Sequence, residues 1–219
     1  MTPRKKRIAI IINGGIATGH FSEGNAALTQ LLSSLATAFD LTVFSLVKTD
    51  AKIKLPFQVI DIPFTHLQNA WLRLFWLFFK LLWNHLFRPF QVIYGFGAFP
   101  SGFLAVLLSK FLRKKSLVTL LGGEYLSIPE IKYGLWSHKY LRPVLNFTFN
   151  HSHELVTLTR TAAGQIQMNL PNQKKHHTIS LGVDTSLFVP TLKYLSEPYE
   201  FLHVADLNPV KNQPMLLAT

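Results

Sequence analysis

The sequence predicts an α/β fold with a doubly wound, Rossmann-like parallel sheet, and two observations support this prediction. First, short runs rich in β-branched residues alternate with longer segments in which apolar residues recur at helical spacing. Second, the short runs are continuously apolar, which is typical of strands that are buried on both faces of a parallel sheet. No internal repeat or low-complexity tract interrupts this order.

The chain opens with a strand, a glycine-rich loop, a helix and a second strand, which together form a βαβ unit. The strands are predicted at Ile8–Ile12 and Leu41–Leu46, and a short third strand at Val59–Ile62 ends before Pro63. The loop does not have the G-x-G-x-x-G spacing of the dinucleotide-binding fingerprint. It is not a P-loop either, because no Gly-Lys-Ser/Thr follows it. The helix between the first two strands is indicated by Leu28, Leu31, Leu32, Leu35 and Phe39.

The segment Ala70–Phe87 is predicted to be a helix that is unusually rich in apolar and aromatic residues. At about 18 residues it has the minimum length of a membrane span, but Arg73, Lys80 and Asn84 form one polar stripe along it. Such a helix suits a membrane interface, and packing against the sheet or a true span are the alternatives. The residues expected to contact a membrane are Trp71, Trp76, Phe79, Lys80 and Trp83.

The alternation of strands and helices continues through the rest of the first 189 residues. Cations gather where the helix that starts at Pro100 ends, and cations suit a helix C-terminus. Strands are predicted at Phe90–Tyr94, Leu117–Leu121, Leu155–Leu158 and Thr178–Leu181, and helices from Pro100, over His138–Asn150 and over Thr161–Met168.

Two glycine-containing loops follow strands and are candidates for lining a binding site. Gly14 and Gly15 follow the first strand, and Gly122, Gly123 and Glu124 follow a later one. Open α/β sheets bind ligands at the carboxyl ends of their strands, so these loops are expected to face a ligand. The alternatives are a plain glycine-rich connection for the first loop and a structural turn with a solvated Glu124 for the second.

The last part of the chain indicates a second domain. Residues 1–189 are predicted to form the first domain, 190–199 a linker, and 200–219 the start of the next domain. A new buried strand is expected at Phe201–Ala205, followed by a helix that starts near Gln213. Lys211 stands just before that helix, and a cation beside a helix N-terminus is a common way to hold phosphate.

Composition narrows the range of functions. The formal net charge is +11, which suits an anionic partner, and no cysteine is present to form disulfides or ligate metal. Neither the run from His151 to Glu154 nor the pair His176-His177 has a third ligand at metal-binding spacing, so no metal is expected. The cations are dispersed, without a basic strip that carries stacking aromatics, so nucleic acid is not an expected partner.

Together these motifs resemble the family 4 retaining glycosyltransferases, which have the two-domain GT-B fold. The run Ile179–Pro190 is similar to the signature that closes the first domain of that family, and Leu202–Asn212 to the segment that opens the second. Gly24-Asn25 resembles a glycine-ended loop before the first helix, and Gly122-Gly123-Glu124 a turn after a later strand. The resemblance covers essentially the whole sequence.

The resemblance implies an enzyme that transfers a sugar, with retention and without metal or other cofactor, from a nucleotide sugar to a glycan or lipid-linked acceptor. It assigns Lys211, Gly24 and Asn25 to the donor phosphates and the two glycine-containing loops to the acceptor side. The aromatic helix would hold the protein on the anionic, cytoplasmic face of the cell membrane. Residues 1–219 alone are expected to be inactive.

The sequence also departs from the family pattern. Leu181 replaces the usual asparagine before Gly182, and Asp206 stands where arginine is common. An aspartate would repel a diphosphate unless its side chain turns away. A non-catalytic membrane-surface module, or a remnant of such an enzyme, is therefore the alternative function.

Overall fold

The computed structural model describes residues 5–14, 16, 26–49, 54–63, 70–169, 176–186, 188–189, 202–205 and 207–217. Within them, one sheet of seven parallel strands has the order β3-β2-β1-β4-β5-β6-β7. The strands are β1 (Arg7–Ile12), β2 (Asp40–Ser45), β3 (Gln58–Asp61), β4 (Val92–Phe96), β5 (Lys115–Leu120), β6 (Glu154–Thr157) and β7 (His176–Thr178). The predicted doubly wound parallel sheet is confirmed.

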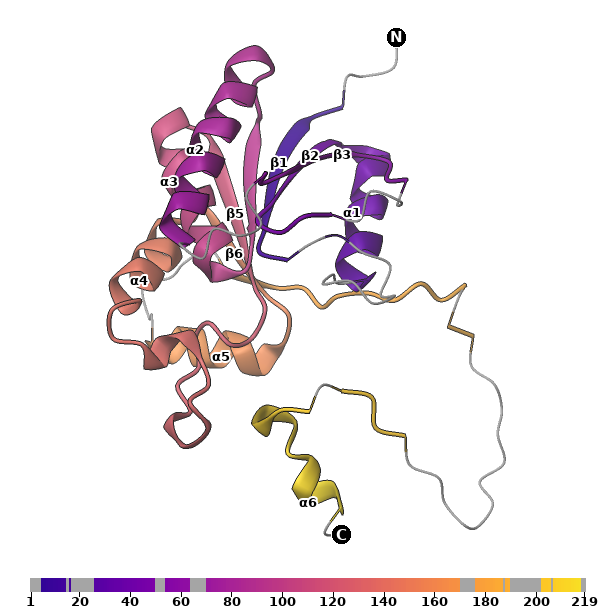
Figure 1. Cartoon of the computed structure of the whole chain (residues 1–219), viewed down its shortest axis with the longest axis vertical. Helices are drawn as coiled ribbons and strands as arrows, with labels where there is room; N and C mark the ends of the chain where they lie inside the picture. Colours follow the sequence, from indigo (N-terminus) through magenta and orange to yellow (C-terminus); the bar gives the residue numbers. More distant parts are fainter. Residues whose placement is uncertain are drawn as a thin grey trace.

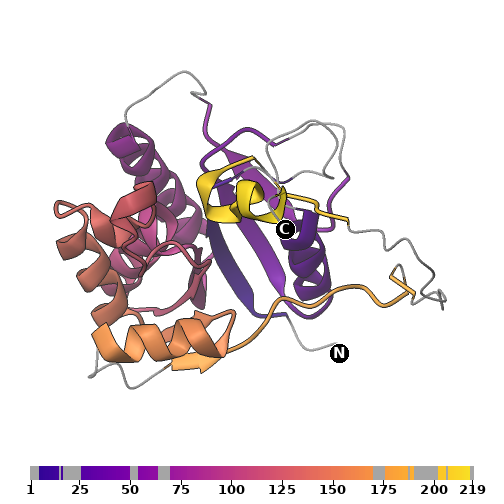
Figure 2. The same cartoon turned by 90° about the horizontal axis from the view of Figure 1, so that it is seen from below.

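Helices cover both faces of the sheet, with α1 on one face and α2, α3 and α4 on the other (Figure 1). Figure 2 shows the same separation from below, with α1 and α2 on opposite sides of the central strands. The helices are α1 (Ala26–Ala38), α2 (Ala70–Phe87), α3 (Phe103–Leu112), α4 (Arg142–His151), α5 (Arg160–Asn169) and the short α6 (Gln213–Leu217).

Alternate residues of β1 enter two different apolar layers. Ile10 and Ile12 pack with Leu32 of α1, whereas Ile11 packs with Leu77 of α2 and lies in the layer that α3 also enters. All are almost fully buried. This double burial explains the continuously apolar strand, because each face of β1 must meet a helix.

Several predicted boundaries are wrong: the last strand, β7, is His176–Thr178 instead of Thr178–Leu181, and the helix expected from Pro100 is α3 at Phe103–Leu112. Two further errors have a clear physical reason. β4 starts at Val92 instead of Phe90, because the N–H of Phe90 donates to His85 Nδ1 (3.2 Å) at the end of α2. α4 starts at Arg142 instead of His138 and carries Pro143 in its first turn. An earlier start would bury the proline in the helix interior, where its ring clashes with the preceding turn.

The expected buried strand at Phe201–Ala205 is also wrong for the residues that the structure describes there. Leu202–Ala205 is not a strand, and the side chains of Leu202 and Val204 are 90% and 84% exposed. None of the described strands pairs with this segment, so it gains no ladder of hydrogen bonds. The expected linker 190–199 lies outside the described residues, and the domain division stays a prediction.

The turn between β4 and α3 depends on close contact between glycine backbones. A Cβ atom on Gly102 would lie 2.5 Å from the carbonyl oxygen of Gly97, and one on Gly95 would lie 2.5 Å from the Cα atom of Gly102. Gly102 itself has ordinary helical φ and ψ angles (−65° and −43°). Space, and not backbone conformation, therefore requires glycine at position 102.

We expect Gly102→Ala to lower the free energy of unfolding by about 1–3 kcal/mol, because the added methyl group overpacks this contact. Gly164→Ala is the matched control, since a Cβ atom there meets nothing within 4 Å. Gly164 lies in the interior of α5, so the control should gain about 0.5–1 kcal/mol. Urea unfolding of both variants tests this, and equal stability of the two would contradict the packing described.

Candidate functional site

The candidate site lies at the carboxyl edge of the sheet, where the loops after β1, β4 and β5 meet. β1 and β4 are neighbours in the sheet, and from them the chain continues to β2 on one side and to β5 on the other. A parallel sheet opens a crevice at such a switch point, outside the carboxyl ends of its strands. The three loops that meet at this point are held together by polar side chains.

Asn13, the first residue after β1, joins its loop to the loop after β4. Its Nδ2 donates to the carbonyl of Phe99 (3.1 Å), and its Oδ1 accepts from the N–H of Ser101 (3.1 Å). The buried hydroxyl of Ser101 donates to the carbonyl of Phe96 (2.6 Å). Gly97 has a φ of +99°, and a Cβ atom there would lie 2.8 Å from Asn13 Nδ2. The conformation and the space both require glycine at position 97.

Glu124 joins the loop after β5 to the same cluster. Only 6% of this residue is exposed, and its carboxylate accepts backbone N–H groups from three residues. These are Ala98 (3.2 Å), Leu121 (3.0 Å to each oxygen) and Gly122 (2.7 Å). Hydrogen bonds to a charged group are the stronger kind in proteins. The alternative of a solvated Glu124 is wrong: the turn is structural, and the carboxylate is what holds it.

The glycines of these loops differ in what surrounds them. A Cβ atom on Gly14 or on Gly122 would meet nothing within 4 Å, and Gly122 has a φ of +128°. On Gly123, by contrast, a Cβ atom would lie 3.0 Å from the hydroxyl of Tyr133. The carbonyl of Gly123 accepts from the N–H of Leu135 (2.9 Å). Gly14 and Gly122 therefore present backbone to open space, whereas Gly123 is covered. That Gly14, Gly122 and Gly123 contact an acceptor stays a prediction.

Two tyrosines border this edge: Tyr125, which directly follows Glu124, and Tyr133, whose hydroxyl lies beside Gly123. Burial, the nearby carboxylate of Glu124 and then Tyr133 raise the pKa of Tyr125 above its ordinary value. The phenol of Tyr125 therefore stays protonated at neutral pH and can donate a hydrogen bond. Glu124 directly follows the two glycines in the sequence and orders the loop beside both tyrosines. Its position is therefore the sequence feature that could have pointed to Tyr125 and Tyr133.

Other predicted site residues lie apart from this edge or outside the described residues. Lys211 ends a short 3₁₀ turn, where Asn208 Oδ1 accepts from its N–H (3.2 Å), and α6 starts at Gln213 as predicted. The role of Lys211 in binding phosphate stays a prediction. Gly15, Gly24, Asn25 and Asp206 lie outside the described residues.

The segment Leu181–Asp184, which was predicted to close the first domain, runs beside α1. Leu181 packs against the apolar layer of that helix. A cavity of about 370 Å³ lies between this segment and Gln30 and Ser34 of α1. Asp184 Oδ1 accepts from the N–H of Ser186 (2.9 Å), which makes an aspartate turn. Over the described part of the chain, no three His, Asp or Glu side chains are grouped to hold a metal ion.

α2 buries one face and exposes the other. Leu74, Leu77 and Leu81 enter the core, whereas Trp71, Phe79 and Trp83 are 56%, 51% and 60% exposed. The exposed side also includes residues outside the predicted membrane-contact set, namely Leu72, Phe75, Leu86 and Phe87, and Phe111 of the neighbouring α3. We call this set of exposed residues the aromatic face.

Trp76 and Lys80 do not belong to the aromatic face. Trp76 is half-buried against the core cluster, and Lys80 is also half-buried. Their membrane contact stays a prediction. An apolar groove of about 390 Å³ lies between α2 and α3, lined by Phe75 and Leu107 among others. Among the helices that the structure describes, none has the length and apolarity needed to cross a bilayer.

We expect Glu124→Gln to lower the free energy of unfolding by about 1–3 kcal/mol. The amide nitrogen of glutamine would face N–H donors that now point at a carboxylate oxygen. Glu130→Gln is the control, because Glu130 is exposed in a 3₁₀ turn of the following loop. Urea unfolding measures both variants, and a loss no larger than that of the control would show that Glu124 does not hold the loops.

No protein-family model matches the sequence, and no curated protein matches it. Solved structures do match the fold. Anabaena HepE in complex with UDP and glucose is 15% identical with a TM-score of 0.60, and the match covers 84% of this chain and 46% of HepE. UDP-N-acetylglucosamine 2-epimerase from Rickettsia bellii is 10% identical with a TM-score of 0.55, over 80% of this chain and 44% of that one.

The corresponding epimerase from Methanocaldococcus jannaschii is 10% identical with a TM-score of 0.52, over 78% of this chain and 44% of that one. The chain thus spans less than half the length of each of these proteins. At such low identity the similarity concerns the fold alone. It supports the predicted Rossmann-like parallel sheet of GT-B type.

Proposed function

We propose that this chain is the acceptor-side part of an enzyme that transfers a sugar from a nucleotide sugar to an acceptor, with retention. The observation that carries the proposal is the fold shared with HepE, whose structures hold UDP, UDP and glucose, or UDP-glucose. The sequence adds the motifs that resemble retaining glycosyltransferases. The open backbone at the carboxyl edge of the sheet is the surface that would meet the acceptor.

In this proposal the carboxyl edge orients the acceptor through its backbone. Gly14 and Gly122 leave room for a sugar ring to approach the main chain, and Glu124 holds the second loop rigid. The protonated phenol of Tyr125 would donate a hydrogen bond to an acceptor oxygen. Such pre-organised donors lower the cost of orienting the acceptor.

The donor phosphates would be held by cations and backbone N–H groups without a metal ion. Lys211, with Gly24 and Asn25, is the group proposed for this role. A lysine alone matches only part of a diphosphate charge, and Asp206 would have to point away from it. The remaining donor contacts are proposed to come from a second domain.

The proposed acceptor is a glycan or a lipid-linked sugar, reached at the cytoplasmic face of the membrane. The support is the aromatic face of α2, where Phe75 is 64% and Phe87 is 69% exposed. Large aromatic side chains beside basic residues suit the interface between lipid and water. A lipid-linked acceptor would then lie close to the protein that modifies it.

Whether UDP is released distinguishes sugar transfer from epimerisation. The protein produced from its complete gene should release free UDP from UDP-sugars labelled in the sugar and pass the label to acceptors in a cell-envelope extract. The transferred sugar should keep its anomeric configuration, as read by NMR, and residues 1–219 alone should transfer none. Label that stays on UDP with altered stereochemistry would show an epimerase. Sustained turnover by residues 1–219 would contradict the two-domain proposal.

A non-catalytic membrane-surface module is the second candidate, and the aromatic face favours it, because this face does not depend on any donor site. Complete absence of UDP release by the full-length protein, together with retained vesicle binding, would identify this function.

We expect Phe75→Glu/Phe79→Glu to abolish sedimentation with phospholipid vesicles, because both charges would enter the apolar part of the interface. Tyr140→Glu/Met168→Glu is the matched control: it adds the same charge at apolar residues that are 73% and 82% exposed on other elements. The control should bind as the wild type does. Equal binding by both variants would remove α2 from the membrane contact.

A further inference from the structure

Cations from separate segments meet at the amino-terminal edge of the sheet, opposite the candidate site. Lys5 and Lys6 precede β1, Arg88 precedes β4, and Lys114 precedes β5. Because β1, β4 and β5 are adjacent and parallel, the residues before them lie at one edge. The sequence shows only dispersed cations, and the topology gathers them.

A pocket of about 570 Å³ lies in this edge. Its lining includes four cations, Lys5, Lys6, Arg7 and Arg88, and Asp40 is its one acid among the described residues. Asp40 is already engaged, because its Oδ2 accepts from Nη2 of Arg88 (2.9 Å). The pocket therefore carries excess positive charge and has a size typical of ligand sites.

Arg7 forms one wall of the pocket and is 6% exposed. Its guanidinium donates to the carbonyl of Arg88 and to the hydroxyl of Thr42 (3.1 Å), and it lies 4.2 Å from the centre of the Phe90 ring. All these contacts are to neutral groups. Among the described residues, none is a hydrogen-bond partner of the buried Arg7 Nε.

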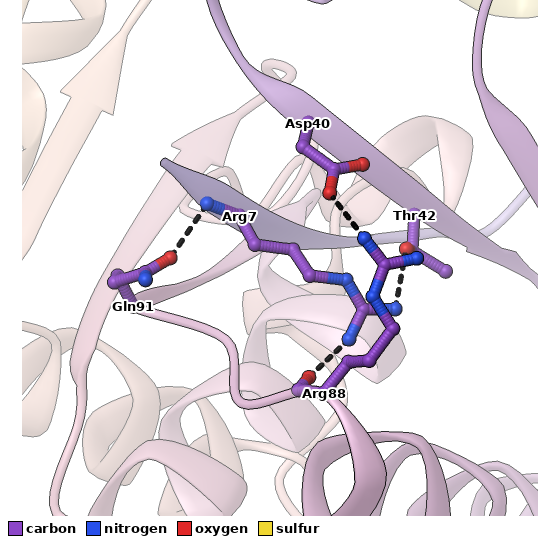
Figure 3. A network of polar contacts seen from close by, with 5 residues as sticks. All are labelled: Arg7, Asp40, Thr42, Arg88 and Gln91. Atoms are coloured by element: carbon purple, nitrogen blue, oxygen red, sulfur yellow. Dashed lines mark hydrogen bonds and ion pairs between the residues drawn. The ribbon is translucent and has the colours of Figure 1, made fainter. Parts of the chain in front are cut away.

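The two arginine groups lie next to each other, as Figure 3 shows, so their charges repel. Burial, and then the charge of Arg88, lower the pKa of Arg7, while Asp40 raises it. The single carboxylate of Asp40 therefore offsets part of the charge of two guanidinium groups, those of Arg7 and Arg88. An anion in the pocket would reduce this repulsion, and a phosphate group matches the planar donors of arginine.

The pocket is continuous with the aromatic face. Phe87, the last residue of α2, lines the pocket and is 69% exposed. Its ring lies 5.0 Å from that of Trp83, centre to centre. At the same edge, the exposed Phe111 near the end of α3 is followed by Arg113 and Lys114. Apolar aromatic rings beside cations are the chemistry of an anionic membrane surface, in which lipid tails lie below charged head groups.

We infer that this pocket, formed by Lys5, Lys6, Arg7 and Arg88, seats the phosphate of an anionic phospholipid head group while the aromatic face rests on the bilayer. The inference rests on the membrane contact proposed for α2 and adds a site to it. Lys5, Lys6 and Arg88 are exposed, and Lys5 Nζ already donates to the carbonyl of Ala36 (2.9 Å). Arg7 supplies a fixed charge behind them. The carboxyl edge, at the other end of each strand, takes no part in this binding.

The test uses Lys6→Gln/Arg88→Gln, with Lys132→Gln/Lys139→Gln as a control that removes the same charge from exposed lysines of another loop. Arg88 and Asp40 form an exposed pair, so the first variant should fold, as urea unfolding will verify. Sedimentation is measured with phosphatidylcholine vesicles, with and without phosphatidylglycerol. The wild type should bind the mixed vesicles more tightly, and the pocket variant should lose about 10- to 30-fold in apparent affinity for them. The control should lose less than about threefold.

Several results would overturn the inference. Equal losses in both variants would show attraction by net charge without a specific site. Equal binding of the wild type to both kinds of vesicle would exclude the anionic head group. Binding of inorganic phosphate, measured by calorimetry, without binding of mixed vesicles would identify a soluble phosphate compound as the occupant. Unchanged vesicle binding by the pocket variant, together with loss of binding in Phe75→Glu/Phe79→Glu, would reject the pocket alone and leave the proposed membrane contact intact.

Discussion

The structure depends on one constraint: all seven strands run parallel and the central ones are buried on both faces. Parallel strands need a crossover after each strand, and these crossovers put helices on both faces of the sheet. The same constraint gives the sheet two chemically different edges. Every strand contributes its start to one edge and its end to the other, whatever the distance between those residues in the sequence.

At the carboxyl edge, polar side chains are used to bind the backbone of loops. Asn13, Ser101 and Glu124 satisfy amides and carbonyls that would otherwise be buried without partners. This leaves Gly14 and Gly122 as open backbone on a rigid frame, which is the arrangement that favours binding of a polar ligand. At the amino-terminal edge the balance is reversed: cations outnumber carboxylates, and Arg7 is held by neutral partners.

Much of the fold could be predicted from the sequence because local patterns determine it. The apolar run Ile8–Ile12 and the helical spacing in Ala70–Phe87 gave β1 and the bounds of α2 correctly. Boundaries failed where a side chain competed with the regular pattern, as at Phe90 and Pro143. The strand at Leu202–Ala205 failed because an apolar run indicates a strand only if a partner strand lies beside it.

The candidate site was harder to predict, since it depends on contacts between distant residues. Glu124 was recognised from its place after two glycines, but its burial under the N–H groups of Ala98 and Gly122 depends on the register of β4 and β5. Trp76 and Phe75 are adjacent in the sequence and both aromatic, yet only Phe75 is exposed, because the helix turns Trp76 toward the core. The basic pocket had no signal in the sequence, because its cations come from two separate segments.

The central claim is that the carboxyl edge of the sheet binds the sugar substrates while the aromatic face contacts the membrane. Residues 1–219 contain no cysteine, so a fluorophore can be attached at Gly14→Cys or at Phe79→Cys in a full-length protein in which any cysteine outside these residues is replaced by serine. The account predicts that the label at position 14 responds to UDP-sugar and not to vesicles, and that the label at position 79 responds to vesicles and not to UDP-sugar. A response to vesicles at position 14, or to UDP-sugar only at position 79, would contradict it.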